Sequence, residues 1–112
     1  MPRDHKLYLR DLLEASERIQ EYTKNMSLGD FERSNITIDA VVRNLEVIGE
    51  AAGKLSPEIK ARSPEIEWPK IVALRNILAH EYFGVNTKIV WDVVQNKLRP
   101  IGDACRKLLE DV

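Results

Sequence analysis

Apolar side chains recur at helical spacing through most of the chain. From about Asp4 to Lys24 they share one helical face and charged residues fill the other: Leu9, Leu12, Leu13, Ile19 and Tyr22. A second series advances by steps of three and four: Ile38, Val41, Leu45, Ile48, Ala52 and Leu55. Because residues three and four apart share a face of an α-helix, both segments are predicted to be amphipathic helices, the second forming the spine of the core.

The connection between these two helices carries capping signals. Ser27 is followed three residues later by Asp30, which resembles a capping box and predicts one helical turn around Phe31. Ser34 or Asn35 is expected to cap the second long helix, because both residue types accept hydrogen bonds from the free N–H groups of a first turn.

Prolines mark the middle of the chain. The segment LSPEIKARSPEIEWPK holds Pro57, Pro64 and Pro69, each where a helix can begin, because the missing N–H of proline costs nothing in a first turn. The segment predicts a short helix and then a loop. A third long helix is predicted from Pro69 to about His80, and Gly84 lies where a helix stop is expected.

The last helix is predicted from Thr87 onward, with Asn86 as its cap. Its apolar positions are Ile89, Val90, Val93, Val94, Leu98, Ile101, Leu108 and Leu109. Pro100 removes one hydrogen bond from its interior and should kink or split it. No run alternates with period two for long enough to be a strand, so the sequence predicts an all-α fold, an up-and-down bundle of four main helices plus short helices.

The composition is that of a globular protein in which positive and negative charges nearly balance. The 112 residues are 44% hydrophobic and 31% charged, which predicts a single domain over residues 1–112. Lys and Arg number 17 against 18 Asp and Glu, so any contact with nucleic acid is expected to be local. The apolar runs are too short to span a bilayer and the N-terminal segment lacks a signal-peptide core, so no membrane association is expected.

The sequence offers few other groups for chemistry. Cys105 is the single cysteine and cannot form an internal disulfide, so a reducing cytoplasm is the expected compartment and the thiol is interpreted as a buried or half-buried apolar group. His5, near the N-terminus with no ligand partner in view, is expected to be exposed. No set of residues has convincing metal-ligand spacing, and no cofactor is expected.

Polar side chains crowd the end of the third long helix, in LRNILAHEYFG. The residues are Arg75, Asn76, His80, Glu81 and Tyr82. At about 100° per residue, Arg75 and Tyr82 share one helical face, whereas Asn76 and His80 share a neighbouring one. Arg75 and His80 themselves lie about 140° apart on a straight helix, so a common target needs the reach of the Arg side chain, a frayed helix end, or a second copy of the motif from another subunit.

These residue types suit cleavage of a phosphodiester. A guanidinium binds a phosphate through two parallel hydrogen bonds, and a histidine titrates near neutral pH and can pass a proton. With the 2′-hydroxyl of RNA as nucleophile, His80 would move protons and Arg75 would stabilise the developing charge without a metal. A structural interpretation is that Arg75 pairs with Glu46 or Glu50, His80 caps its helix and Tyr82 packs its ring; spacing alone favours it, because short Arg/His combinations are common.

The string RNILAHEY resembles the Arg-x4-His-x-Tyr signature of HEPN ribonucleases, in particular the HepT-like toxins. The blocks DAVVRNLEVIGEAAGKLSPEIK and PEIEWPKIVALRNILAHEYFGVNTKIVWDVVQNKLRPI are similar to the two characteristic blocks of HepT-like proteins, and the resemblance covers nearly the whole chain. The polar residue just after the motif Arg, often Asn in this family, is Asn76 here.

The resemblance implies a HEPN-like homodimer whose two motifs face each other across a cleft and cut RNA without metal, with Arg75 and His80 in the catalytic roles. It also implies a toxin of a type VII HepT/MntA toxin–antitoxin system. There an MntA-like nucleotidyltransferase antitoxin transfers AMP from ATP to the motif tyrosine, which Tyr82 matches, within a complex that can be larger than the dimer. The added phosphate esters would bring negative charge and bulk beside Arg75 and repel RNA.

The second long helix carries a polar seam beside its apolar one. Asp39, Arg43, Glu46 and Glu50 follow at steps of four, three and four, and either are solvated or line the cleft; Arg43 and Glu46 are supporting candidates for RNA binding together with Asn76. Gly49, in mid-helix, costs about 1 kcal/mol relative to Ala and predicts close approach of a neighbouring helix or subunit.

The aromatic residues do not indicate a broad RNA surface. Trp68 and Trp91 are interpreted as core or interface anchors rather than base-stacking platforms, since aromatic residues are only 6% of the chain. A small RNA footprint, such as a tRNA end, is therefore expected. Two alternatives stay open: a non-catalytic helical partner of a nucleotidyltransferase that binds a nucleotide or holds its substrate, with Arg75 and His80 as a phosphate clamp, and a purely structural assembly protein.

Overall fold

The computed structural model describes the backbone of residues 2–80 and 86–111, and the side chains of residues 5–76 and 86–111. The described backbone is helical and contains no strand, as the sequence predicts. Its elements are α1 (Pro2–Tyr22), α2 (Leu28–Glu32), α3 (Asn35–Lys54), α4 (Pro57–Ala61), α5 (Trp68–His80), α6 (Thr87–Asn96) and α7 (Leu98–Asp111).

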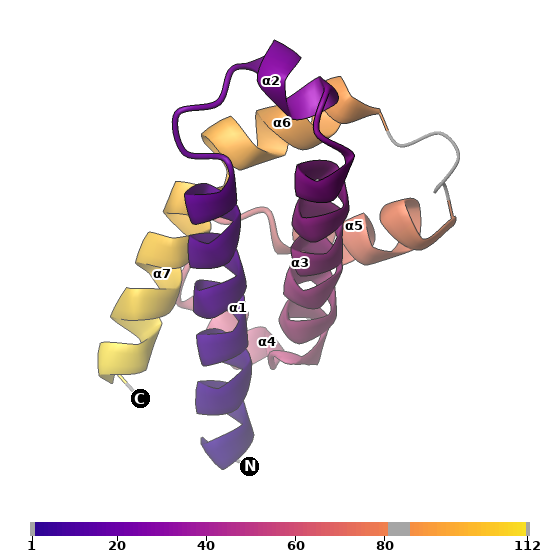
Figure 1. Ribbon diagram of the computed structural model, residues 1–112. Coiled ribbons are helices and arrows are strands. Elements are labelled where there is room, and N and C mark those ends of the chain that lie inside the picture. The colour runs from indigo at the N-terminus through magenta and orange to yellow at the C-terminus, as the bar shows by residue number, and fades with distance from the viewer. Residues whose placement is uncertain (1, 81–85, 112) are drawn as a thin grey trace.

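The long helices pack in the order α7, α1, α3, α5. α1 lies between α3 and α7 and runs antiparallel to both, while α5 packs against the other side of α3 (Figure 1). α2 and α6 lie across one end of the bundle, and α4 follows α3 toward the other end (Figure 1). This order places α5, which carries Arg75, on the outside of the bundle against the spine helix.

The core is built from the apolar faces that the spacing predicts. The largest fully buried side chains of the three central helices are Leu9, Leu12 and Ile19 on α1, Val41, Leu45 and Ile48 on α3, and Leu98, Ile101 and Leu108 on α7. A polar contact joins two of these helices, because the buried Ser16 hydroxyl on α1 donates to the carbonyl of Leu98 at 3.1 Å. Burial of these faces is the main favourable term that orders the bundle.

The helix boundaries follow the capping signals. Ser27 and Asp30 form the predicted capping box: the Ser27 hydroxyl accepts from the Asp30 N–H at 3.1 Å, and the Asp30 carboxylate accepts from the Ser27 N–H at 3.1 Å. The backbone hydrogen bond from Ser27 lowers the pKa of Asp30. Ser34 caps α3, with its hydroxyl accepting from the N–H of Thr37, and Asn86 caps α6.

Pro100 splits the C-terminal helix, as predicted. α6 ends at Asn96, Lys97 is the break, and α7 begins at Leu98. Proline has no N–H to donate to the carbonyl four residues earlier, so the ladder is interrupted there, and Pro100 sits in the first turn of α7, where its missing N–H is harmless.

Three sequence-based expectations about exposure were wrong. Tyr22 is 42% exposed, because α1 ends there and Thr23 takes the inward position four residues after Ile19. Ile89 is 62% exposed, since α6 turns Val90 and Val94 inward instead.

His5 is the third. It was expected at the surface but is buried, because α1 already begins at Pro2 and Leu9, one turn further on, lies in the core. Its Nδ1 is buried without a hydrogen-bond partner among the described residues.

The tryptophans and the cysteine behave as predicted. The buried Trp68 donates its Nε1–H to the carbonyls of Lys60 and Ser63, both at 3.1 Å, and so anchors the loop before α5. The Trp91 ring lies 5.1 Å from the Phe31 ring and joins α6 to α2. Cys105 is fully buried, and its burial raises the pKa of the thiol to about 12, which keeps it protonated and unreactive. No described helix is long and apolar enough to cross a membrane.

Candidate active site

α5 carries the first half of the predicted motif on its exposed side. Arg75 and Asn76 are adjacent, exposed residues in this helix. His80 is the last residue of α5, so the helical backbone runs unbroken from Arg75 to His80. The side chain of His80, and residues 81–85 with Glu81, Tyr82 and Gly84, lie outside the described part of the chain.

A close contact with α3 fixes the position of Arg75. A Cβ placed on Gly49 would come within 2.9 Å of both the backbone N and the Cβ of Arg75, and within 3.2 Å of the Ile71 carbonyl oxygen. No larger residue fits without moving one of the helices, which confirms the close approach predicted for Gly49. The backbone of Arg75 is therefore held against the spine helix while its side chain faces outward.

A surface pocket of about 300 Å³ lies beside Arg75. It is lined by two glycines, one apolar residue and four polar or charged residues: Gly49, Gly53, Val72, Glu50, Lys54, Arg75 and Asn76. Gly53 has no such packing constraint, because a Cβ there would meet only Val72 Cγ1, at an ordinary 3.6 Å. The absence of a side chain at Gly53 leaves space in the wall of the pocket that α3 forms.

Arg75 has no ion-pair partner among the described residues, and Glu50 lines the same pocket. Glu50 pairs with Lys54 at 3.7 Å in an exposed contact within α3. Within the described part of the chain, Arg75 makes no ion pair with Glu46, Glu50 or any other carboxylate. The predicted structural alternative for Arg75, a salt bridge to α3, is thus not seen among these residues, and its guanidinium can take a phosphate.

The polar seam of α3 only partly reaches this pocket. Of its four members, Glu50 lines the pocket, whereas Asp39, Arg43 and Glu46 are not among the lining residues. Relative to Glu50, the half-buried Glu46 lies one turn and the exposed Arg43 two turns nearer the start of α3. Their predicted role in RNA binding therefore concerns a surface beside the pocket.

Three residues of the pocket escaped the sequence interpretation: Gly53, Lys54 and Val72. The sequence could have indicated this pocket, because Gly49 and Gly53 are four residues apart and give one face of α3 no side chains.

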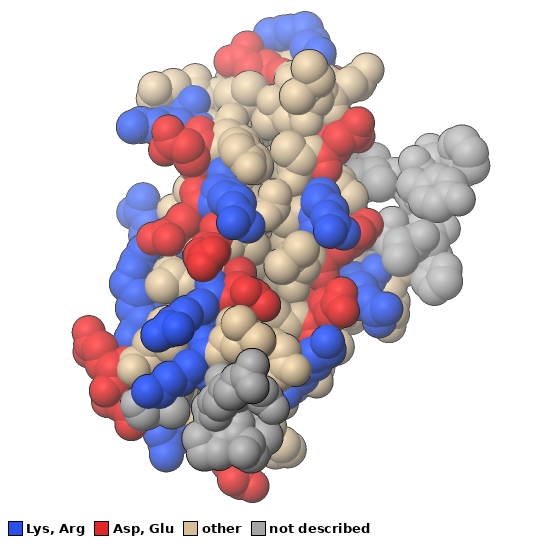
Figure 2. All heavy atoms as spheres, turned by 60° about the horizontal axis from the view of Figure 1, so that its bottom comes forward, with Lys and Arg blue, Asp and Glu red and all other residues tan. Residues whose placement is uncertain are grey.

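The wider surface is not strongly basic on the face seen in Figure 2. Lys and Arg are interspersed there with Asp and Glu. The exposed pair Lys70–Glu67, at 2.9 Å, lowers the pKa of the Glu67 carboxyl through the hydrogen bond from Lys70. Within the described ranges, no three His, Cys, Asp or Glu side chains gather as metal ligands would. Such a surface offers an anion a few placed cations rather than a continuous basic field.

Comparison with known proteins gives a consistent result. Residues 12–108 match the family described as "Ribonuclease HepT-like". A protein of Thermococcus cleftensis named "Probable ribonuclease HepT" is 38% identical over 108 residues, which are 96% of this chain and 98% of that protein. A Methanocaldococcus jannaschii protein named "Putative RNase MJ0127" is 35% identical over 113 residues, covering 100% of this chain and 93% of its own length.

Another relative is longer than this chain. The M. jannaschii protein named "Gamma-glutamylcyclotransferase and putative RNase MJ0434" is 37% identical over all 112 residues, and the chain spans only 50% of its length. No solved structure matches the chain.

Proposed function

The chain belongs to the HepT-like ribonuclease family, and from this premise we propose that it is a metal-independent endoribonuclease toxin that acts as a dimer in the cytoplasm. The observation that carries the proposal is the placement of Arg75. Its backbone is fixed against Gly49, its side chain is exposed beside a pocket, and it has no carboxylate partner in the described part of the chain. Arg75 and His80 are the catalytic residues, with Asn76, Arg43 and Glu46 in supporting contacts to RNA.

The chemistry needs only groups of the chain and the substrate. The 2′-oxygen of RNA attacks the adjacent phosphorus as His80 takes its proton, the bond from phosphorus to the 5′-oxygen breaks, and the leaving oxygen gains a proton. The products are a 2′,3′-cyclic phosphate and a 5′-hydroxyl. Arg75 stabilises the negative charge that builds on the non-bridging phosphate oxygens.

Cleavage is expected to continue in EDTA. The sequence offers no set of side chains with metal-ligand spacing, and the substrate supplies its own nucleophile. Purified protein incubated with RNA in excess EDTA should give the same products at the same rate as in magnesium, by gel and by mass spectrometry of the 3′ ends. Loss of activity in EDTA that magnesium restores would contradict this mechanism.

The protein is expected to be a dimer at micromolar concentration. Arg75 and His80 lie about 140° apart around one helix, and a two-fold axis can bring the Arg75 of one subunit and the His80 of the other to one phosphate. Light scattering coupled to size exclusion should give twice the chain mass of 12.9 kDa. A monomer throughout the micromolar range would rule out a composite site.

Tyr82 is the proposed switch. An MntA-like nucleotidyltransferase antitoxin would attach AMP to its phenol: the phenol oxygen bonds to the α-phosphorus of ATP, pyrophosphate leaves, and the phenol proton is lost. The added charge and bulk near Arg75 would keep RNA out. The partner enzyme and the HepT-like chain would then form a type VII toxin–antitoxin pair, in a complex that can exceed the dimer.

Tyr82→Phe is expected to weaken neutralisation far more than RNA cleavage or folding. Phenylalanine keeps the ring but has no oxygen to accept AMP. After incubation with the partner and ATP, the unchanged protein should gain roughly 329 Da per AMP and lose activity, whereas the variant should keep its mass and its activity. If the variant still gains that mass, the acceptor is another residue.

The alternative function is a non-catalytic partner that binds a nucleotide or holds the substrate of a nucleotidyltransferase, with Arg75 and His80 as a phosphate clamp. It predicts that the purified dimer binds nucleotides but leaves RNA intact. Cleavage that disappears in His80→Ala separates the two functions, and a purely structural role would make the same variant lose stability with no activity to lose.

A further inference from the structure

A larger pocket, of about 540 Å³, lies where α1 ends and α6 passes into α7. It falls in the size range of ligand sites, roughly 300–1,000 Å³. None of its lining residues belongs to α3 or α5, so it is separate from the pocket beside Arg75. Two features of the backbone form this pocket. One is the break between α6 and α7, and the other is Asn25, whose φ of 64° turns the chain away after α1.

The lining of this pocket is polar and carries only positive charge. It contains Lys24 and Arg99 and no carboxylate. Neither cation makes an ion pair with a described residue, whereas Arg106, further along α7, is held by Glu17 at 3.1 Å and Asp103 at 3.0 Å. A pocket with two cations and no acid attracts an anion, and the guanidinium can bind a phosphate through two hydrogen bonds.

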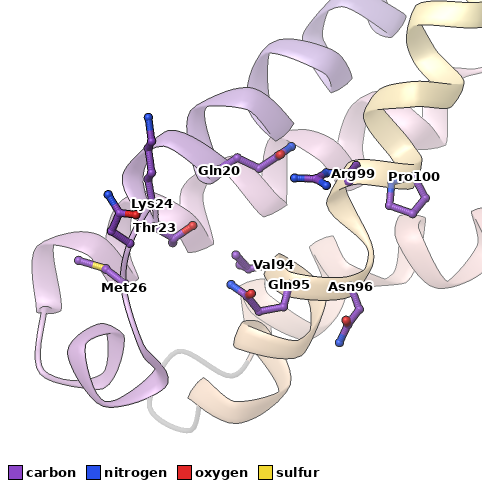
Figure 3. A pocket seen from close by; sticks show the side chains of 10 residues that line it. Gln20, Thr23, Lys24, Met26, Val94, Gln95, Asn96, Arg99 and Pro100 are labelled. Atoms are coloured by element: carbon purple, nitrogen blue, oxygen red, sulfur yellow. The ribbon is translucent and has the colours of Figure 1, made fainter.

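Most of the other polar groups of the lining are side-chain amides: Gln20, Asn25, Gln95 and Asn96. The Asn96 amide nitrogen donates to the Asp92 carboxylate at 2.6 Å, and the hydroxyl of Thr23, also in the lining, donates to the carbonyl of Ile19 at 2.9 Å. In Figure 3 the side chains of Gln20 on α1 and Arg99 on α7 point toward each other, and Lys24, at the end of α1, points in a different direction. The Gln20 amide nitrogen donates to Ser16 at 3.1 Å, which leaves its carbonyl oxygen as an acceptor. The lining has no aromatic residue on which a base could stack.

From this arrangement we infer that the pocket is a second RNA-binding site, which holds the ribose–phosphate backbone of the substrate away from the cleavage site. Arg99 and Lys24 bind phosphate, and the amides accept from and donate to the 2′-hydroxyls, which DNA lacks. The choice of RNA among phosphate-bearing ligands rests on the proposed function. Such a site lets a chain of net charge −1 hold RNA through a few local phosphate contacts in addition to those at the cleavage site.

The test measures binding separately from cleavage. A double variant, Lys24→Gln with Arg99→Gln, and a control, Arg62→Gln with Lys107→Gln, are each made in a His80→Ala background. The control pair loses the same charge from two exposed residues outside the pocket. Fluorescence anisotropy then gives the affinity for a labelled 20-nucleotide RNA over a range of salt concentrations.

The double variant is expected to bind the RNA about tenfold more weakly, and the slope of its log binding constant against log salt concentration should be shallower by about one to two units. The control pair should bind within about twofold of the His80→Ala background and keep its slope. With intact His80, the double variant should lose rate on the long RNA, whereas the control pair should not. Equal binding by the double variant and the control would overturn the inference.

The same experiment distinguishes the two proposals. If the unchanged protein does not cleave RNA but binding still depends on Lys24 and Arg99, the proposed nuclease function fails and the second site stands. If cleavage occurs and the double variant changes nothing, the second site fails alone. If the binding of free AMP depends on Lys24 and Arg99 while the binding of RNA does not, the pocket holds a free nucleotide and the inference is wrong.

Discussion

His80→Ala is expected to lower the rate of RNA cleavage by roughly 10²–10⁴-fold, and Arg75→Ala by about 10²–10³-fold. The histidine variant loses the group that moves protons, and the arginine variant loses the donor that meets the developing charge. Folding should survive the arginine change, because alanine keeps the Cβ and backbone N that contact Gly49, and only the exposed part of the side chain is lost. Single-turnover cleavage of a defined RNA measures both effects.

A matched control is Arg62→Ala, which removes an arginine of equal charge at the end of α4. Arg62 is exposed and does not line the pocket beside Arg75, so the cleavage rate should stay within about twofold of the unchanged protein. Circular dichroism checks that all three variants are folded. A folded Arg75→Ala protein with full activity would show that this residue has only a structural role.

Gly49→Ala is expected to destabilise the protein by about 1–3 kcal/mol, the usual cost of forcing atoms into a packed contact. The new methyl would lie 2.9 Å from the backbone N and Cβ of Arg75 and cannot avoid them by a side-chain rotation. α5 must therefore move away from α3, and Arg75 moves with it. RNA cleavage should fall in the folded variant as well, because phosphate contacts are sensitive to shifts of about 1 Å.

Gly53→Ala is the matched control for this change. It adds the same methyl one turn later on α3, where the nearest atom, Val72 Cγ1, is at 3.6 Å. Alanine is the better helix former, so stability should be unchanged or rise by up to about 1 kcal/mol. Urea unfolding at one fixed protein concentration compares the pair. Equal stability of the two variants would mean that α3 and α5 do not meet at Gly49.

The helices and their ends were largely predictable because their causes are local. The steps of three and four placed α1 and α3, Ser27 with Asp30 placed α2, and Pro100 placed the break before α7. Gly49 was also informative, since a glycine inside a helix has a cost that a close helix contact can offset.

Exposure near helix ends was harder to predict, because it depends on where a helix stops relative to its neighbours. The same three-and-four spacing suits Ile19 with Tyr22 and Ile19 with Thr23, and only the packed bundle buries Thr23. His5 was misjudged because spacing near a terminus does not show whether the helix already covers it.

The candidate site also has a part that was predictable from local sequence and a part that depends on packing. Arg75, Asn76, His80 and Tyr82 were predicted from one short string, whereas the pocket beside Arg75 joins that string to α3 across more than twenty residues of sequence. Gly53 and Lys54 are unremarkable residue types singly, and only the packing of α3 on α5 brings them beside Arg75, whereas Val72 lies one turn before Arg75 on the same helix. The pocket at the α6–α7 break combines three helices and had no signal in any one of them.

The central claim is that the chain cleaves RNA by using the substrate's own 2′-hydroxyl. The most direct measurement is cleavage of two oligonucleotides by the purified protein in EDTA: an RNA, and the same RNA with a single 2′-deoxy substitution at the nucleotide that precedes the cut. The account predicts that the RNA is cut to a 2′,3′-cyclic phosphate and a 5′-hydroxyl, and that the substituted RNA is not cut at that bond. Equal cleavage of both oligonucleotides, or no cleavage of either, would contradict it.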